Sequence, residues 1–309
     1  MALFNQNKPL RIKLTRDLTK HIKRGNPWIF SDAIEKIKAR DGEYAILVNH
    51  KNEVLAHGFY ASSVNLAYRV VTLGDKRITD AEILARINRA VQNKKHLLTS
   101  ENNCFRLLNG EGDELPGVVA DYYKGLLVLK LDGASSENFW NKEEIAKALF
   151  AIKDIPVSGV YYKRKNSEED KGQMLIGEAT DLTNYEFLEH NVRFKTNIVD
   201  AAKTGFFLDQ RENRNFIRSV AKGKSLLNLF GYTGGFSVYA GLGGATKVTT
   251  VDIAPNAIEA STLNWKINNL PENNHEALCE DAFQFVSHAQ EDKKTWDIVI
   301  TDPPLFVEV

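Results

Sequence analysis

From residue 209 onward, segments typical of helices alternate with short apolar runs typical of buried strands. The helix-like segments are 209–221, 234–242, 255–270 (with Pro255 in its first turn) and 281–289. The strand-like runs are SLLNLF (225–230), KVTTVDI (247–253), HEALCED (275–281) and TWDIVITD (295–302). Parallel strands need such crossovers, which place helices on both faces of the sheet. The pattern therefore predicts a doubly wound α/β domain over residues 196–309.

The preceding residues follow a different pattern, and we divide them into a β-rich module at 1–77 and an α+β module at 78–195. In the first module, the runs 43–49, 54–61 and 66–74 are typical of strands, and a helix is expected around 15–24. A helix over about 80–98 follows, because Thr79 and Glu82 form a capping box ahead of a helical apolar period.

Turn residues organise the second module. NGEGDELPG (109–117) predicts a loop, and Tyr123-Lys124-Gly125 predicts a hairpin turn between two β-rich runs. We expect a helix over 137–151, an exposed loop at 163–172 and a second hairpin that turns near His190-Asn191.

Charge is unevenly distributed, although the 309 residues have no net charge. Residues 1–77 contain 14 Lys and Arg against 7 Asp and Glu, a net charge of +7. A basic module on an acidic body favours contact with a polyanion such as nucleic acid, although a solvated surface is the alternative. Candidate contacts are Arg16, Lys20, Lys23 and Arg24.

The two cysteines, Cys104 and Cys279, form neither a metal-binding spacing nor a disulfide framework, so no metal is expected. With no signal-peptide core and no apolar run of about 18 residues, the sequence predicts a cytoplasmic protein without a membrane segment. Cys279 lies within the predicted strand 275–281, and we expect it to be a buried core residue.

A doubly wound sheet binds ligands beyond the carboxyl ends of its strands. The first such end is Asn228-Leu-Phe-Gly-Tyr-Thr-Gly-Gly235, where glycines let the backbone turn sharply and approach a ligand. It does not match the dinucleotide fingerprint G-x-G-x-x-G. The alternative is a tight strand–helix turn that binds nothing.

An acidic residue lies at the end of each of the three remaining predicted strands. Asp252 can accept hydrogen bonds from both ribose hydroxyls of an adenosine, and Asp281 can meet an adenine amino group, although each can instead cap a helix. At the fourth end, Asp302-Pro303-Pro304-Leu-Phe306 predicts an acid that faces a flipped base, with Phe306 placed to stack on it.

These four elements, in this order, resemble motifs I to IV of the class I methyltransferases. Lys203–Arg214 is similar to the segment before the cofactor domain in large-subunit ribosomal RNA methyltransferases, where it helps to close the cofactor site. Gly25-Asn-Pro-Trp28-Ile-Phe30 resembles a PUA RNA-binding domain, and Asn109–Leu131 resembles the family's central domain. The resemblance covers nearly the whole chain. It is closest to the PUA-containing cytosine-C5 methyltransferases of large-subunit ribosomal RNA.

The resemblance implies S-adenosylmethionine as cofactor and ribosomal RNA as partner, with a homodimer left open. Trp28 joins the four basic residues as an implied RNA contact. The implied catalytic residues are Asp302, Pro303, Pro304 and Phe306. The implied cofactor contacts are Lys203, Phe207, Asp209, Arg211, Asn228, Phe230, Gly231, Tyr232, Thr233, Gly234, Gly235, Asp252, Ile253, Asp281 and Ala282.

Two features depart from the family pattern. The sequence stops at Val309, after the fourth strand, whereas the class I sheet continues with three more strands, so we expect an open edge and a fold truncated after motif IV. The family also uses a cysteine thiolate that adds to cytosine C6, and neither Cys104 nor Cys279 matches that position.

Two other functions remain open. One is methylation of an exocyclic amine, as in D-P-P-[YF] enzymes, although Leu305 before Phe306 weakens that match. The other is a non-catalytic RNA-binding remnant.

Overall fold

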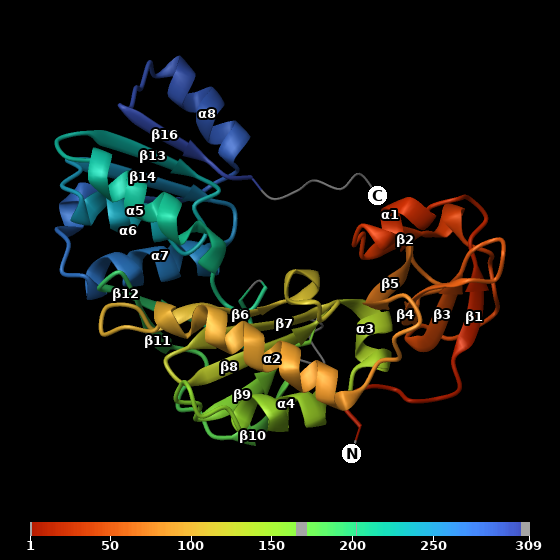
Figure 1. Cartoon of the computed structure of the whole chain (residues 1–309). Coiled ribbons are helices and arrows are strands. Elements are labelled where there is room, and N and C mark those ends of the chain that lie inside the picture. The colour runs from red at the N-terminus through yellow and green to blue at the C-terminus, as the bar shows by residue number, and fades with distance from the viewer. Residues whose placement is uncertain (1, 165–171, 202, 304–309) are drawn as a thin grey trace. The chain divides into compact units, whose positions relative to one another are not determined.

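The structure, a computed structural model, describes residues 2–164, 172–201 and 203–303. The chain forms two compact units, the first comprising Met1–Leu98 with Phe105–Thr180 and the second Thr99–Cys104 with Asp181–Val309. Both are drawn in Figure 1. In the described ranges, every helix is too short or too polar to cross a lipid bilayer.

The first unit begins with a five-stranded sheet in the order β1-β3-β4-β5-β2. The strands are β1 (Leu10–Lys13), β2 (Trp28–Phe30), β3 (Glu43–Val48), β4 (Val54–Tyr60) and β5 (Leu66–Leu73), with α1 (Thr19–Lys23) and the 3₁₀ turn η1 (Ser31–Ala33) between them. The predicted strands and early helix are confirmed. One face of the sheet is buried around Ile12, Leu47 and Tyr68.

A second five-stranded sheet follows, in the order β10-β9-β8-β7-β6. Its strands are β6 (Cys104–Asn109), β7 (Val118–Tyr123), β8 (Leu126–Leu131), β9 (Gly159–Tyr162) and β10 (Gln173–Gly177). The predicted hairpin joins β7 to β8, and Lys124 and Gly125 take the positive φ values that a tight turn needs. The sequence did not indicate β6, β9 or β10. The predicted exposed loop at 163–172 lies largely outside the described residues.

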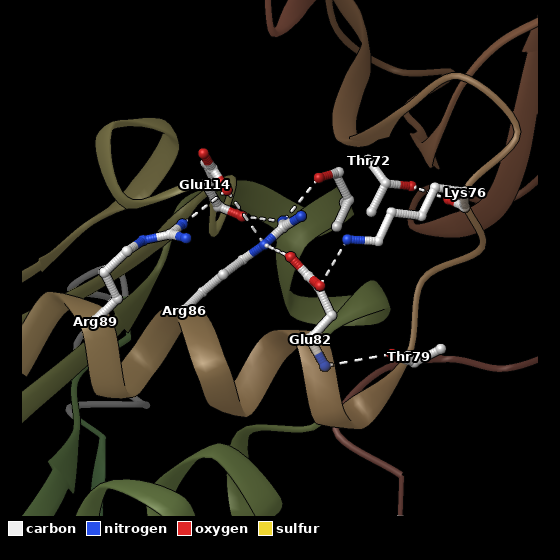
Figure 2. Close-up of polar contacts among 8 residues, drawn as sticks. Thr72, Lys76, Thr79, Glu82, Arg86, Arg89 and Glu114 are labelled. Carbon is white, nitrogen blue, oxygen red and sulfur yellow. Dashed lines mark hydrogen bonds and ion pairs between the residues drawn. The ribbon is translucent and has the colours of Figure 1, made fainter.

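Helix α2 (Asp80–Lys94) contributes Ile83, Ile87 and Val91 to the core of this unit. Thr79 caps it as predicted, since its hydroxyl accepts a hydrogen bond from the Glu82 amide. Figure 2 shows that Glu82 lies between Lys76 and the buried Arg86, whose guanidinium donates to the carbonyls of Val71 and Glu114. Arg86 therefore joins strand β5 to the loop that follows β6. The 3₁₀ turn η2 (Lys95–Leu97) extends the helix.

The single helix predicted over 137–151 is instead two helices, α3 (Gly133–Phe139) and α4 (Lys142–Phe150). The chain is extended at Trp140, whose indole nitrogen donates to the Pro116 carbonyl, and Asn141 then caps α4. Phe139 stacks on Phe59 of β4, with 4.5 Å between ring centroids. Phe59, with Tyr44 and Val71, thus joins the first sheet to the core cluster of the second sheet.

The second unit contains a parallel four-stranded sheet in the order β15-β14-β13-β16. Its elements are β13 (Ser225–Leu229), β14 (Lys247–Asp252), β15 (His275–Cys279), β16 (Ile298–Thr301), α5 (Arg211–Val220), α6 (Gly235–Leu242), α7 (Pro255–Ile267), α8 (Ala282–Glu291) and the 3₁₀ turns η4 (Leu208–Gln210) and η5 (Glu272–Asn274). Residues of α5, α6 and α7 pack on one face, against Leu226 and Val248, and α8 packs on the other. Figure 1 shows these two layers. The predicted doubly wound fold is confirmed.

The predicted hairpin of β11 (Tyr185–Glu189) and β12 (Val192–Thr196) turns at His190 and Asn191. The amides of Arg193 and Lys195 donate to Asn268 and Asn264, so the hairpin is fixed along α7 within the second unit.

Candidate functional site

The loop after β13 reverses the chain within five residues. Phe230, Tyr232 and Gly234 have φ values of 55°, 47° and 75°, a left-handed conformation that only glycine adopts at low cost. At Gly231, a Cβ would lie 2.5 Å from the Thr250 side chain, so the loop lies directly on β14. This geometry turns the backbone over the carboxyl end of β13 and starts helix α6.

Asp252, at the end of β14, supports this loop. One carboxylate oxygen accepts a hydrogen bond from the Tyr232 amide at 2.8 Å, and the other accepts one from the Ala254 amide at 3.0 Å. A carboxylate oxygen has two lone pairs, so each can still accept a further hydrogen bond from a ligand. Asp252 is therefore a loop anchor as well as a candidate ribose ligand.

A chain of buried polar groups runs beneath the loop and across the sheet. Asn228 donates to the Ser237 hydroxyl at 2.9 Å, Ser237 shares a hydrogen bond with Thr250 at 2.7 Å, and Thr250 reaches His275 at 2.8 Å. The His275 ring also stacks on Trp265. Burial lowers the pKa of His275 to about 4, so its imidazole is neutral at neutral pH.

The segment from Lys203 to Arg211 adjoins the loop. The Phe207 ring meets the Tyr232 ring edge to face at 5.4 Å, and the Tyr232 hydroxyl lies 3.5 Å from the Gly205 carbonyl. Lys203 and Asp209 are exposed, while the Arg211 side chain is mostly covered and pairs with Glu212. The structure thus brings this segment and the glycine-rich loop together.

A buried ion pair lies beneath the start of α6. Arg214 donates two hydrogen bonds of 2.7 Å to the carboxylate of Glu189, and the two side chains are 3% and 1% exposed. Its guanidinium also lies over the Phe206 ring. A Cβ at Gly235 would approach both Arg214 and Phe206 at about 3.1–3.2 Å, so the first residue of α6 rests on this pair.

Sequence reasoning missed Glu189, because it lies 25 residues from its partner in a hairpin whose pattern indicated only strands. Three side chains, Glu189, Arg214 and Phe206, form this support from separate parts of the chain, and no local motif marks it. The sequence offered one signal, which is that Glu189 follows the apolar residues Phe187 and Leu188 in a predicted strand.

Asp281 caps helix α8, with one carboxylate oxygen accepting from the amides of Phe283 and Gln284. Asp281 is therefore a helix cap, and any contact with adenine would have to use its other carboxylate oxygen. Nearby, Ile253 and Phe283 are strongly exposed at 69% and 65%, whereas Ala282 is buried. The Phe283 ring meets Phe230 of the loop edge to face. An apolar surface thus adjoins Asp252 on this edge of the sheet.

Cys279 is not the buried core residue that the sequence predicted. It is exposed at the end of β15, beside Asp252 in the strand register, and its thiol lies 3.5 Å from the Ile253 carbonyl. The prediction was wrong because β15 is the outermost strand of the described sheet, so its final residue faces solvent. Cys104 is buried.

Asp302 and Pro303 follow β16 and are exposed at the carboxyl edge of the sheet. Pro304 and Phe306 lie outside the described residues. Strands β14 and β13 separate Cys279 from Asp302, and three strand spacings amount to roughly 14 Å. The Cys279 thiol and the Asp302 carboxylate therefore lie in different parts of this edge.

In the first unit, the predicted RNA contacts cluster around α1. Lys20, Lys23 and Arg24 are exposed on the helix and its end, and Arg16 pairs with Asp32 at 2.8 Å. Trp28 on β2 is 44% exposed, and its indole nitrogen donates to Glu111.

Comparison with known proteins agrees with this arrangement. The profile of S-adenosylmethionine-dependent methyltransferases matches residues 110–309, and that of the PUA-like domain matches residues 12–73. Ribosomal RNA large subunit methyltransferase I of Photobacterium profundum is 32% identical over 307 residues, covering 96% of this chain and 76% of the relative. Ribosomal RNA large subunit methyltransferase of Deinococcus radiodurans is also 32% identical, over 310 residues, covering 96% and 75%.

Among solved structures, a Streptococcus mutans protein described as a SAM-dependent methyltransferase shares the fold at 24% identity, with a TM-score of 0.85 over 96% of this chain and 77% of that one. A second, described as a methyltransferase in complex with SAH, is 25% identical, with a TM-score of 0.86 over 97% of this chain and 77% of that one. The predicted fold, cofactor and enzyme class are confirmed. The chain belongs to the family of S-adenosylmethionine-dependent methyltransferases that includes the large-subunit ribosomal RNA methyltransferases.

Proposed function

We propose that this chain transfers a methyl group from S-adenosylmethionine to a base of large-subunit ribosomal RNA, with cytosine C5 as the target atom. The names of its relatives and the basic charge of residues 1–77 support RNA as the substrate. When bound, S-adenosylmethionine supplies an electrophilic methyl group. The chain's own residues bind it, orient it and present the base.

The observation that carries this proposal is the position of Asp252. Its carboxylate holds the Tyr232 amide and keeps one lone pair on each oxygen, at the carboxyl end of the strand beside the glycine-rich loop. Asp252 would bind the ribose hydroxyls, and the Asn228–Gly235 loop would hold the methionine end. Asp281, Ile253 and Ala282 would border the adenine, and Lys203, Phe207, Asp209 and Arg211 would border the loop.

The glycine-rich loop fits such a ligand by an independent observation. The Thr233 hydroxyl is buried and, among the described residues, has no hydrogen-bond partner. Buried hydroxyl groups are almost always paired. A polar ligand group or a water at this loop would satisfy it.

Asp302 would face the target base at the end of β16. Attack by cytosine C5 also needs a thiolate that adds to C6, because this carbon alone is a weak nucleophile. Cys279 lies across two strands from Asp302, and Cys104 is buried. We therefore expect the 309-residue chain to bind the cofactor but to methylate C5 very slowly.

The cofactor assignment is tested by calorimetric titration with SAH, the demethylated product of S-adenosylmethionine. Asp252→Ala should weaken binding by roughly 1.5–3 kcal/mol, because it removes a charged acceptor and releases the Tyr232 amide. Glu259→Ala, an exposed change on α7, is the matched control and should bind as the parent does. Equal SAH affinity in Asp252→Ala and the parent would contradict the assignment.

The reaction is tested by radiolabelled methyl transfer to undermodified large-subunit RNA, followed by analysis of the methylated base. Slow formation of C5-methylcytosine, and of no other methylated base, is the expected result, and no methyl transfer at all would contradict the proposed reaction. Robust C5 methylation would contradict the thiolate argument and make Cys279→Ala the next variant to assay. Methylation of an exocyclic amine would replace the C5 assignment.

A further inference from the structure

Two large aromatic side chains are exposed on one face of the edge strand β2. Trp28 is 44% exposed and Phe30 is 46% exposed, while Ile29 between them is fully buried. Residues two apart on a strand share a face, so both rings lie on the side that β2 turns away from the core. Strand β2 pairs with β5 alone within the described sheet. Two ring faces are therefore available to a partner.

The Trp28 ring is held in one orientation. Its indole nitrogen donates to a carboxylate oxygen of Glu111 at 2.9 Å, and that oxygen also accepts from Arg69 at 2.8 Å. The second nitrogen of the Arg69 guanidinium pairs with Asp132 at 2.7 Å. The Arg69 guanidinium thus lies between the two carboxylates and offsets part of their negative charge beside the ring.

Glu111 itself belongs to a firmly anchored loop, the NGEGDELPG segment 109–117, which includes the 3₁₀ turn η3 (Gly110–Asp113). Lys94 pairs with Asp113 at 2.6 Å and donates to the Leu107 carbonyl. Beyond Asp113, Arg86 donates to the Glu114 carbonyl, and Arg89 pairs with the Glu114 side chain (Figure 2). The basic face of α2 thus fixes the loop that orients Trp28.

Positive charge lies beside the two rings in the chain. Lys20, Lys23 and Arg24 are exposed a few residues before Trp28, in a module with a net charge of +7. Cations that bind phosphates, together with open aromatic faces, form the usual surface for unpaired nucleic acid. A duplex buries its base faces within the stack and would leave the rings unused.

We propose that Trp28 and Phe30 form a stacking surface for two unpaired RNA bases and that Glu111 positions the Trp28 ring. The inference rests on the proposed function in taking RNA as the substrate. It adds that the recognised RNA is single-stranded or bulged and that the loop 109–117 belongs to the recognition surface.

The test compares binding of the full chain to a labelled, non-self-complementary RNA of about 12 nucleotides and to the same strand annealed to its complement. Fluorescence anisotropy reports both affinities. Trp28→Ala and Phe30→Ala should each weaken single-strand binding about tenfold and leave duplex binding within about twofold. Trp28→Phe should restore most of the loss, because it keeps a ring. Phe216→Ala, an exposed aromatic on α5, is the matched control and should bind as the parent does.

The role of Glu111 has its own comparison. Glu111→Ala should weaken single-strand binding severalfold, whereas Glu111→Gln keeps an acceptor for the indole and should bind more tightly than Glu111→Ala. Equal losses in these two variants would overturn the positioning role.

Unchanged single-strand affinity in both Trp28→Ala and Phe30→Ala would overturn the stacking surface. Equal losses for single strand and duplex would also do so. Changed sedimentation in Trp28→Ala with RNA affinity intact would assign the surface to a second copy of the chain and overturn the proposal. The anisotropy experiment measures RNA binding and not methyl transfer. Failure of the proposed reaction would therefore be seen separately, in the radiolabel assay.

Discussion

Among the residues that the structure describes, each unit contains one buried arginine on a helix, and the two are neutralised in different ways. Arg214 of the second unit meets a single carboxylate, that of Glu189, which is itself fully buried. Arg86 of the first unit donates to two backbone carbonyls and borders Glu82 and Glu114, which are 26% and 58% exposed. The first arrangement excludes water, whereas the second remains close to it.

This difference predicts different consequences of mutation. A buried charge that loses its partner has no substitute, whereas water can reach the Glu82 and Glu114 carboxylates beside Arg86. The location also differs, because Arg214 and Phe206 support the first residue of α6 beside the glycine-rich loop. Damage to the Arg214 pair should therefore reach the cofactor site, and damage at Arg86 should not.

The largest expected effect is at Glu189. Glu189→Gln should destabilise the second unit by about 3–5 kcal/mol, because it leaves the Arg214 charge buried and unpaired. Urea unfolding, with hydrogen exchange of β13 as the local probe, measures the loss. The double variant Glu189→Leu with Arg214→Met should recover most of it, since it removes both charges. A loss below about 1 kcal/mol in Glu189→Gln would show that the pair is not the buried contact described.

The matched control is the exposed pair Arg193–Glu186 of the same hairpin, with side chains 49% and 32% exposed. Arg193→Met should cost less than about 1 kcal/mol, because solvent screens such pairs. SAH titration sharpens the comparison further. Affinity should fall in the Glu189→Leu, Arg214→Met double variant and stay unchanged in Arg193→Met.

A smaller effect is expected in the first unit. Arg86→Met should cost about 1–3 kcal/mol, because the Val71 and Glu114 carbonyls lose their donor. Hydrogen exchange in α2 and β5 measures it. Arg89→Met, on the exposed side of the same helix, should be nearly neutral. A fall in SAH affinity with Arg86→Met would contradict the view that only the Arg214 pair supports the cofactor site.

The last effect depends on pH and is absent at neutral pH. The pKa of His275 is about 4 in the folded chain and about 6.5 in an unfolded one. Between these two pH values only the unfolded state binds the proton. The contribution of neutral His275 to the free energy of unfolding is therefore complete above pH 6.5, and it falls as the pH drops toward 4, by up to about 1.4 kcal/mol per pH unit. Unfolding of the second unit against pH measures it. His275→Gln should flatten the profile, and His288→Gln, at an exposed site, should not.

Much of the architecture could be predicted from the sequence alone. The alternating pattern after residue 209 is local, because helix and strand periods depend on neighbouring residues, and it predicted four strands along the chain and a parallel sheet. Tight turns are local too, which is why the hairpins at 123–125 and 190–191 were found. The glycine-rich loop and the acidic residues at the strand ends were also predicted, because the carboxyl ends of parallel strands lie at one edge of the sheet.

Tertiary structure decided what depends on distant partners. Trp28 and Glu111 are 83 residues apart, and Arg214 and Glu189 are 25 apart, so no sequence window contains either pair. The exposure of Cys279 follows from β15 being the outermost strand of the described sheet, which its own residues do not encode. Asp252 shows both influences: its place at a strand end follows from the local pattern, whereas its hydrogen bond to Tyr232 exists only because β13 and β14 lie side by side.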